Sequence, residues 1–385
     1  MFAPDFEKGV MKYSTTMSFR HILTAVFSVF LLNFAVAQEA ENKAEEAHPA
    51  TATEEAGEKK FDAGEMIIEH ISDSHDWHLW GEGHSSVAIP LPIILYTDKG
   101  MDFFMSSKFE HGHEKVEGKY TYALVGNEIK AANADGTYNE EAKIYDFSIT
   151  KNVATLFIVA GLLLFVFLTV AAAYKKNPNK APSGLQSFME PFIMFIRDDI
   201  AKQSIGPKYE KFMPYLLTVF FFIWFSNMLG LVPFPPGGAN LTGNIAVTLV
   251  LACLTFIIVL LNGNKHYWGH IFAMPGVPKP VLLILTPIEI MGVFLRPFVL
   301  MIRLFANITA GHIIALAFLS LIFIFGEMNK YAGLGVSVLS VAFDVFMGLM
   351  EVLVALIQAY VFTLLSAIYF GAAVEEAHHH DESIV

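Results

Sequence analysis

Apolar residues dominate the chain from residue 153 onward and fall into runs long enough to cross a membrane. Residues 153–174, 212–232 and 245–261 each approach the roughly 20 apolar residues that a helix needs to span a bilayer core. Two further runs, 287–325 and 331–373, would measure about 58 and 64 Å as continuous helices. Either each run breaks into two spans or both helices tilt, and the absence of a polar loop within either run favours a tilted hairpin. The pattern therefore predicts an all-α polytopic membrane protein with about five membrane helices, the last two forming that hairpin.

Two other segments have mixed patterns. Residues 183–203 alternate aromatic residues such as Phe188 with charged residues such as Arg197, which predicts an amphipathic helix on the membrane surface. Residues 61–150 contain strand-like pieces at 86–96 and 120–125, with turn signals between them. We expect a small, partly β, extracytoplasmic domain there.

The N-terminus has the pattern of a secretory signal, with Arg20 before an apolar run and Ala35-Val36-Ala37 after it. An uncleaved first membrane helix is the alternative, although the run is short for a span. Residues 38–60 are rich in Glu and Ala with few large apolar side chains, which is typical of disorder. The predicted organisation is a signal peptide at 1–37 with Met11 and Met17 as alternative starts, a disordered acidic segment at 38–60, an extracytoplasmic extension at 61–150, a membrane domain at 151–378 and a tail at 379–385.

Composition agrees with a membrane protein, since 54% of the residues are hydrophobic, 16% are charged and the mean hydropathy is +0.49. The net charge of -12 comes from residues 38–150, which hold 23 acidic and 9 basic residues, so nothing points to nucleic acid. The single cysteine, Cys253, excludes a disulfide framework within the chain. His75, His78 and His84 suggest a metal site, but exposed polar histidines are favoured because their spacing is not diagnostic.

Lysines indicate how the chain is oriented. Lys175, Lys176 and Lys180 follow the first span directly, which by the positive-inside rule places that end in the cytoplasm. The loop at residues 233–244 has no charged residue, so the second and third spans form a hairpin that dips outward and returns. We expect a cytoplasmic C-terminus.

Two polar stripes run along the two longest apolar helices. On a wheel of 100° per residue, the members of each stripe share one face. An arginine at the centre of a membrane helix costs about 2.5–3.5 kcal/mol on insertion scales, so such residues are functional candidates by default. Structural ion pairs, such as Arg303 with Glu351 or Asp344, are the alternative. The stripes consist of Glu289, Arg296, Arg303 and Asn307 on the first helix and Asp344, Glu351 and Gln358 on the second.

These residue types suit ion translocation. Arg303 keeps its proton at physiological pH, so it can repel cations and attract a carboxylate but cannot carry a proton. Glu351 and His312 can titrate near neutrality in a suitable environment. His312 lies nine residues beyond Arg303 and therefore on the opposite side of the helix. Asn227, inside the second span, either hydrogen-bonds across helices or lines a water-filled path. Together they predict a proton path interrupted by a fixed positive charge.

The matching elements for a known family are Pro287-Ile-Glu289, Arg296-Pro297, Arg303-Leu-Phe-Ala-Asn307 and Leu356-Ile-Gln-Ala-Tyr-Val-Phe362. Through them the chain resembles subunit a of the F-type ATP synthase membrane sector. The resemblance covers about residues 153–378. The segment 38–150 is not part of the common core of that family.

The resemblance implies that Arg303 faces a rotating ring of c subunits and separates two aqueous half-channels. It assigns Asn227, Asn307, His312, Glu351 and Gln358 to the outer half-channel and its support, and Glu289 to the inner one, with Arg296 and Asp344 as support. In some relatives the acid is on the earlier helix and the histidine on the later one. The exchange seen here predicts that His312 and Glu351 meet across the hairpin.

The resemblance also implies partners and a location. It implies a c-subunit ring, b-type peripheral stalk subunits and the F1 ATPase sector, in a bacterial inner membrane and without cofactor or metal. A self-contained ion transporter or channel is the alternative, but no two matching halves are present. An intramembrane hydrolase is disfavoured because the chain has neither an HExxH nor a GxSxG element. The choice between proton and sodium stays open, because it should lie mainly in the c subunit.

Overall fold

A computed structural model of the chain describes residues 61–80, 87–112, 114–133, 137–139, 142–176, 181–232, 237–272, 274 and 277–375. All of them belong to one compact unit, Phe61–Val385. The predicted signal peptide at 1–37, the acidic segment at 38–60 and the tail at 379–385 lie outside the described residues.

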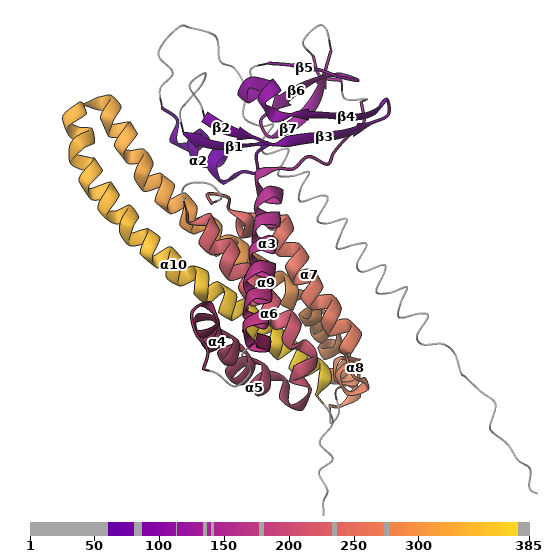
Figure 1. Ribbon diagram of the computed structural model, residues 1–385. Coiled ribbons are helices and arrows are strands. Elements are labelled where there is room, and N and C mark those ends of the chain that lie inside the picture. The colour runs from indigo at the N-terminus through magenta and orange to yellow at the C-terminus, as the bar shows by residue number, and fades with distance from the viewer. Residues whose placement is uncertain are drawn as a thin grey trace, which may run out of the picture. The chain divides into compact units, whose positions relative to one another are not determined.

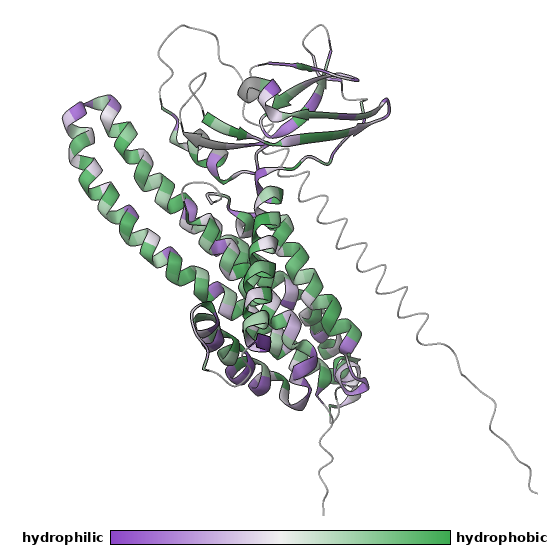
Figure 2. Ribbon diagram, in the orientation of Figure 1, coloured by the Kyte–Doolittle hydropathy of each residue, from purple (hydrophilic) through white to green (hydrophobic). Residues whose placement is uncertain are grey.

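The described part of the chain contains five helical stretches that are long and apolar enough to cross a membrane, as predicted. Figure 2 shows apolar residues along most of their length and polar residues gathered near helix ends. The spanning helices in Figure 1 are α3 (Lys151–Lys176), α6 (Tyr209–Gly230), α7 (Ile245–Asn262), α9 (Lys279–Met328) and α10 (Lys330–Val374).

Helices α9 and α10 form one long hairpin. They have 50 and 45 residues and continue without a break, even though α9 contains Pro287 and Pro297. The alternative in which each run splits into two spans is therefore wrong. At 1.5 Å per residue both helices exceed a hydrocarbon core of roughly 30 Å by more than twofold, so they must tilt to stay in the bilayer.

The tip of the hairpin is a tight turn at Asn329. Its backbone is extended, and its side-chain oxygen accepts a hydrogen bond from the Tyr331 amide, which caps the start of α10. A Cβ on Gly333 would lie 2.7 Å from the Cα of Gly326, so only glycine allows the two helices to approach this closely at the tip.

A further helical segment precedes α6. It comprises α4 (Leu185–Phe195), a π-helical turn (Ile196–Ala201) and α5 (Lys202–Ile205), and the turn Gly206–Lys208 then leads into α6. Gly206 has a φ of 74°, which ends α5 and changes the direction of the chain. This segment corresponds to the predicted amphipathic helix. The short helix α8 (Lys265–Phe272) was not predicted.

Residues 61–146 form one helix, a 3-10 turn and eight short strands in the described part of that segment. The sheets are antiparallel, with strand orders β1-β2, β4-β3-β8 and β5-β6-β7. Ile93, Phe104, Tyr122 and Ile129 fill a core shared by the second and third sheets. The elements are α2 (Ala63–Ile71), β1 (Asp76–Trp80), β2 (Val87–Pro90), β3 (Pro92–Thr97), β4 (Gly100–Met105), η2 (Ser106–Gly112), β5 (Val116–Glu117), β6 (Thr121–Val125), β7 (Glu128–Ala132) and β8 (Ile144–Asp146).

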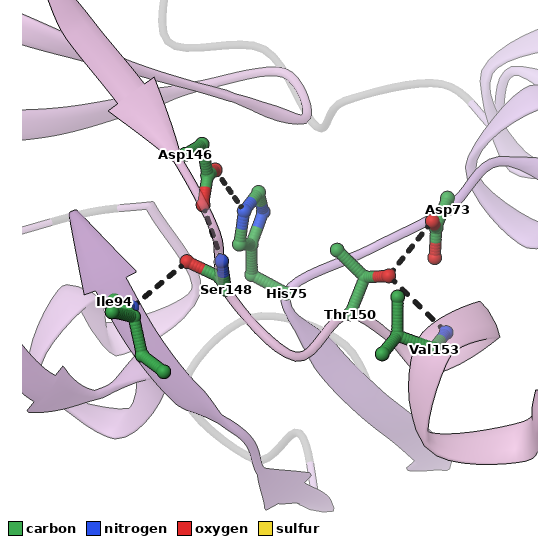
Figure 3. Close-up of polar contacts among 7 residues, drawn as sticks. All are labelled: Asp73, His75, Ile94, Asp146, Ser148, Thr150 and Val153. Atoms are coloured by element: carbon green, nitrogen blue, oxygen red, sulfur yellow. Dashed lines mark hydrogen bonds and ion pairs between the residues drawn. The ribbon is translucent and has the colours of Figure 1, made fainter. Parts of the chain in front are cut away.

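Polar contacts fix the junction between the strands and α3 (Figure 3). Asp73 accepts hydrogen bonds from the Thr150 hydroxyl, at 2.8 Å, and from the Asn152 amide, at 3.0 Å. This carboxylate therefore caps the start of α3, where negative charge is favourable. His75 Nε2 lies 2.7 Å from Asp146 Oδ2. Burial raises the pKa of Asp146, but the hydrogen bonds from His75 and Ser148 outweigh it and hold that pKa below its usual value.

Candidate functional site

Helices α6, α9 and α10 enclose a cavity of about 80 Å³. Four of the predicted site residues line it, and they come from all three helices: Asn227, Asn307, His312 and Glu351. Most of the remaining lining is apolar, including Ile308, Met347 and Met350. The structure thus brings together residues that are up to 124 positions apart in the sequence. A space of this size can hold water.

Asn227 is 3% exposed and reaches two neighbouring elements. Its side-chain oxygen accepts a hydrogen bond from the Thr242 hydroxyl, in the turn Leu241–Gly243 before α7, and its amide nitrogen donates to the Ala355 carbonyl on α10 at 3.4 Å. The hydrogen bond across helices is therefore present, and Asn227 also lines the cavity. A water-filled path stays a prediction. Nothing in the sequence pattern had indicated that Thr242 would contact the site.

Glu351 presents a free carboxylate oxygen inside the protein. Its Oε1 is buried and has no hydrogen-bond partner among the described residues. A Cβ on Gly311 would lie 2.5 Å from that oxygen, so the carboxylate uses space that a glycine on α9 leaves open. An unpaired buried oxygen is costly, and this one is available to bind a proton or a water molecule.

His312 packs at the opposite side of the same cavity. Its Nε2 lies 3.8 Å from the position that a Cβ on Gly230 would occupy, so the ring rests on the last turn of α6. His312 and Glu351 line one cavity, but no hydrogen bond joins them in the described part of the chain, so their meeting across the hairpin stays a prediction. Gly230 is the last residue of α6, so the cavity lies toward the end of α6 that leads into the following loop.

The N-terminal segment reaches the loop that covers this end. Trp77 of β1 is 6% exposed, and its indole nitrogen donates to the Gly237 carbonyl at 3.1 Å. Gly238 in turn donates its amide to the Leu229 carbonyl at 3.2 Å, which folds the loop back over the last turn of α6. Sequence reasoning missed this contact, since nothing in the pattern joins Trp77 to a loop 160 residues away.

Arg303 lies on the outward face of α9. Its side chain is exposed, whereas Leu300 and Leu304 on the other face are each 1% exposed. Arg303 has no ion pair with any described carboxylate, so the alternative of a structural pair with Glu351 or Asp344 finds no support. Asn307, one turn further on, is also exposed and still borders the cavity.

A second, smaller cavity of about 10 Å³ lies near Arg296. The Arg296 guanidinium lies 5.6 Å from the centre of the Tyr369 ring, within cation–π range. Tyr267 of α8 also lines this space, and its buried hydroxyl has no partner among the described residues. Burial raises the pKa of Tyr267, and Arg296 and Glu289 act on it in opposite directions. Sequence reasoning missed both tyrosines.

The remaining predicted residues lie apart from the larger cavity. Gln358 is 4% exposed on α10, and Asp344 and Glu289 are half-buried. Within the described residues no group of three or more His, Cys, Asp or Glu side chains could hold a metal ion. His75 pairs with Asp146, and His84 lies outside the described residues.

Sequence comparisons identify related proteins. A family profile described as ATP synthase A chain matches residues 153–371, and one described as a domain of unknown function (DUF8433) matches residues 66–147. The chain is 46% identical to ATP synthase subunit a of Chlorobium phaeobacteroides (strain DSM 266 / SMG 266 / 2430) over 244 residues, covering 62% of this chain and 68% of the relative. It is 42% identical to ATP synthase subunit a of Pelodictyon phaeoclathratiforme over 286 residues, covering 71% and 81%. Residues 151–385 make up less than 71% of this chain. The match to the Pelodictyon protein must therefore include part of the N-terminal segment.

Proposed function

The chain belongs to the ATP synthase A chain family and serves as the proton-translocating stator subunit of that enzyme; from this premise we propose that Arg303 is the fixed charge that separates two half-channels. The observation that carries the proposal is that Arg303 is exposed on a membrane helix without a described ion partner in its own chain. Such a charge is tolerated where another chain supplies the counter-charge. We assign that counter-charge to a carboxylate on a c-subunit ring.

The larger cavity is the proposed outer half-channel. His312 and Glu351 both line it, and each can bind and release a proton, while Asn227 and Asn307 can orient water between them. A proton entering from this side would pass through these groups to a ring carboxylate, and neutralisation of that carboxylate would let it leave Arg303. Gln358 and Asp344 extend the same stripe of α10 as supporting residues.

The region around Glu289 and Arg296 is the proposed inner half-channel. A ring carboxylate that returns to Arg303 is favoured in its charged form and releases its proton there, because arginine keeps its charge at any physiological pH. Glu289 can accept that proton on its way out. Arg296, held near Tyr369, supports this end of the path.

The orientation follows from the lysines at the end of α3. Lys175 and Lys176 belong in the cytoplasm by the positive-inside rule, which places residues 61–150 outside the cytoplasm and the C-terminus inside. We assign the protein to a bacterial inner membrane, with residues 1–37 as the export signal. As part of an ATP synthase it assembles with other subunits of that enzyme, among which we propose the c ring, a b-type peripheral stalk and the F1 sector.

Replacing Arg303 tests the proposal. Arg303→Gln should abolish ATP-driven proton pumping into membrane vesicles, a loss of about 100-fold or more, because nothing then keeps the two half-channels apart. The assembled complex should still be recovered, because the side chain has no described partner within the chain. Lys330→Gln, which removes an exposed charge at the hairpin tip, is the control and should pump normally. Coupled pumping by the Arg303→Gln enzyme would refute the assignment.

A further inference from the structure

The sheet β4-β3-β8 presents an apolar face on the side away from its core. On one face Ile93, Leu95 and Phe104 are buried in the core shared with the sheet β5-β6-β7. An antiparallel sheet with one face on a core normally presents polar side chains on the other. Here every outward position is apolar instead. These positions are Pro92, Ile94 and Tyr96 on β3, Met101, Phe103 and Met105 on β4, Tyr145 on β8 and Phe147 just after β8.

The outward side chains are well exposed and lie next to one another. Phe103 is 69% exposed, Phe147 66%, Met101 64% and Tyr145 57%. Tyr96 pairs with both Met101 and Tyr145 across the strands, and the rings of Tyr96 and Tyr145 are 6.4 Å apart. A contiguous patch of this kind without a charged member marks a surface that is covered in the working protein.

The edge strand continues into a membrane helix. Beyond β8, the amides of Phe147 and Ile149 donate to the carbonyls of Ile94 and Pro92, each within 3.0 Å, so the sheet pairing persists until α3 begins at Lys151. At about 3.3 Å per residue, Phe147 is at most about 13 Å from the start of α3. The patch therefore lies close to the start of α3, a helix whose surface is also apolar and exposed, with Phe157 at 63% and Phe165 at 66%.

The junction also ties the sheet to the start of a membrane helix. The contacts of Asp73 and of the His75–Asp146 pair hold the strands against the first turn of α3 (Figure 3). Figure 1 shows β3 and β4 extending sideways from the start of α3, with β5 and β6 on the side away from the helices. The outward face of β4-β3-β8 is the face opposite the core that the two sheets share, and its strand β8 leads directly into α3.

We propose that the outward face of β4-β3-β8 rests on the lipid bilayer surface beside α3. Tyrosine and phenylalanine are suited to this zone, because their rings bury apolar area while the tyrosine hydroxyl stays hydrated. The segment that matches the domain of unknown function thereby becomes a lipid-bound platform at the end of α3. The proposal does not depend on the role of Arg303.

Spin labelling of the assembled complex in phospholipid nanodiscs tests this proposal. In a Cys253→Ala background, a nitroxide at Phe103→Cys should collide more with oxygen, which concentrates in lipid, than with a water-soluble nickel chelate. A label at Glu128→Cys, an exposed position on β7, should show the reverse order. Met101→Cys gives a second probe of the same face if the first variant assembles poorly.

Each outcome decides the question. A lipid-like ratio at residues 101 and 103 together with a water-like ratio at 128 supports the proposal. A water-like ratio at 101 and 103 overturns it. Protection of these labels from both reagents also overturns it, because another subunit or another segment of the chain would then cover the patch.

Discussion

The N-terminal segment and the α9–α10 hairpin differ in whether their ionisable side chains have hydrogen-bond partners. In the N-terminal segment Asp73, Asp102 and Asp146 each accept hydrogen bonds from described neighbours. In the hairpin Arg303 and Glu351 have no such partner among the described residues, although their surroundings are far more apolar. Unpaired polar groups in such surroundings are costly. The paired groups here stabilise the structure, and the unpaired ones are those for which we propose an exchange with water or with another chain.

After Arg303, single replacements of the acid or the histidine of the cavity should have the largest effect on proton pumping. Glu351→Gln and His312→Gln should each reduce ATP-driven proton pumping by about 100-fold, the lower end of the scale of a lost acid–base group. The double exchange His312→Glu/Glu351→His should pump faster than either single variant, because both groups serve one cavity. Initial pumping rates in vesicles measure this. A double exchange no better than the single variants would argue against a shared path.

Filling the space beside Glu351 should disturb the hairpin less severely. Gly311→Ala places a Cβ against Glu351 Oε1, so we expect a destabilisation of about 1–3 kcal/mol and slower pumping as the carboxylate moves. Gly292→Ala, on the same helix with nothing within 4 Å of its Cβ, is the matched control. Thermal stability and pumping are measured for both. If both variants lost stability and pumping to the same extent, the effect of Gly311→Ala would not arise from its contact with Glu351.

Breaking the contact between the N-terminal segment and the loop after α6 should have a smaller effect. Trp77→Phe removes the hydrogen bond to Gly237 and should lower the free energy of unfolding by about 0.5–1.5 kcal/mol, with most of the pumping retained. Tyr331→Phe, a change at a residue that is 83% exposed, serves as control. Heat-induced loss of the assembled subunit reports the difference. A Trp77→Phe enzyme of normal stability that no longer pumps would place Trp77 with the unpaired, functional groups.

The smallest expected effect is on the stability, at acid pH, of the junction between the strands and α3. The folded-state pKa of Asp146 is depressed, so its stabilising contribution is complete above the unfolded value of about 3.9 and is lost as the pH falls through the folded value. Asp146→Asn should therefore be less heat-stable than the parent at pH 6–8, and the difference should shrink below about pH 4. Melting curves across that range measure it. A difference that grows in acid would contradict the pairing with His75.

The amino-acid pattern predicts much of the fold because membrane helices satisfy their backbone hydrogen bonds internally. The apolar runs at residues 153–174, 212–232 and 245–261 correspond closely to α3, α6 and α7. The 3.6-residue period likewise placed Arg303 and Asn307 on one face of α9, where both are exposed. The helix α2 and the pairing of β8 with β3 were not predicted, because both depend on contacts between segments far apart in the chain.

For the site, the sequence by itself determined which residues can carry charge or a proton within the membrane, since that follows from residue type and from position on a single helix. Only the tertiary structure decided which of them share a cavity. It placed Asn227, His312 and Glu351 around one space and left Arg303 outside it, facing away from its own chain. It also showed Thr242 and Gly311 to be neighbours of that space. Periodicity fixes directions within one helix, but distances between helices depend on how their surfaces pack.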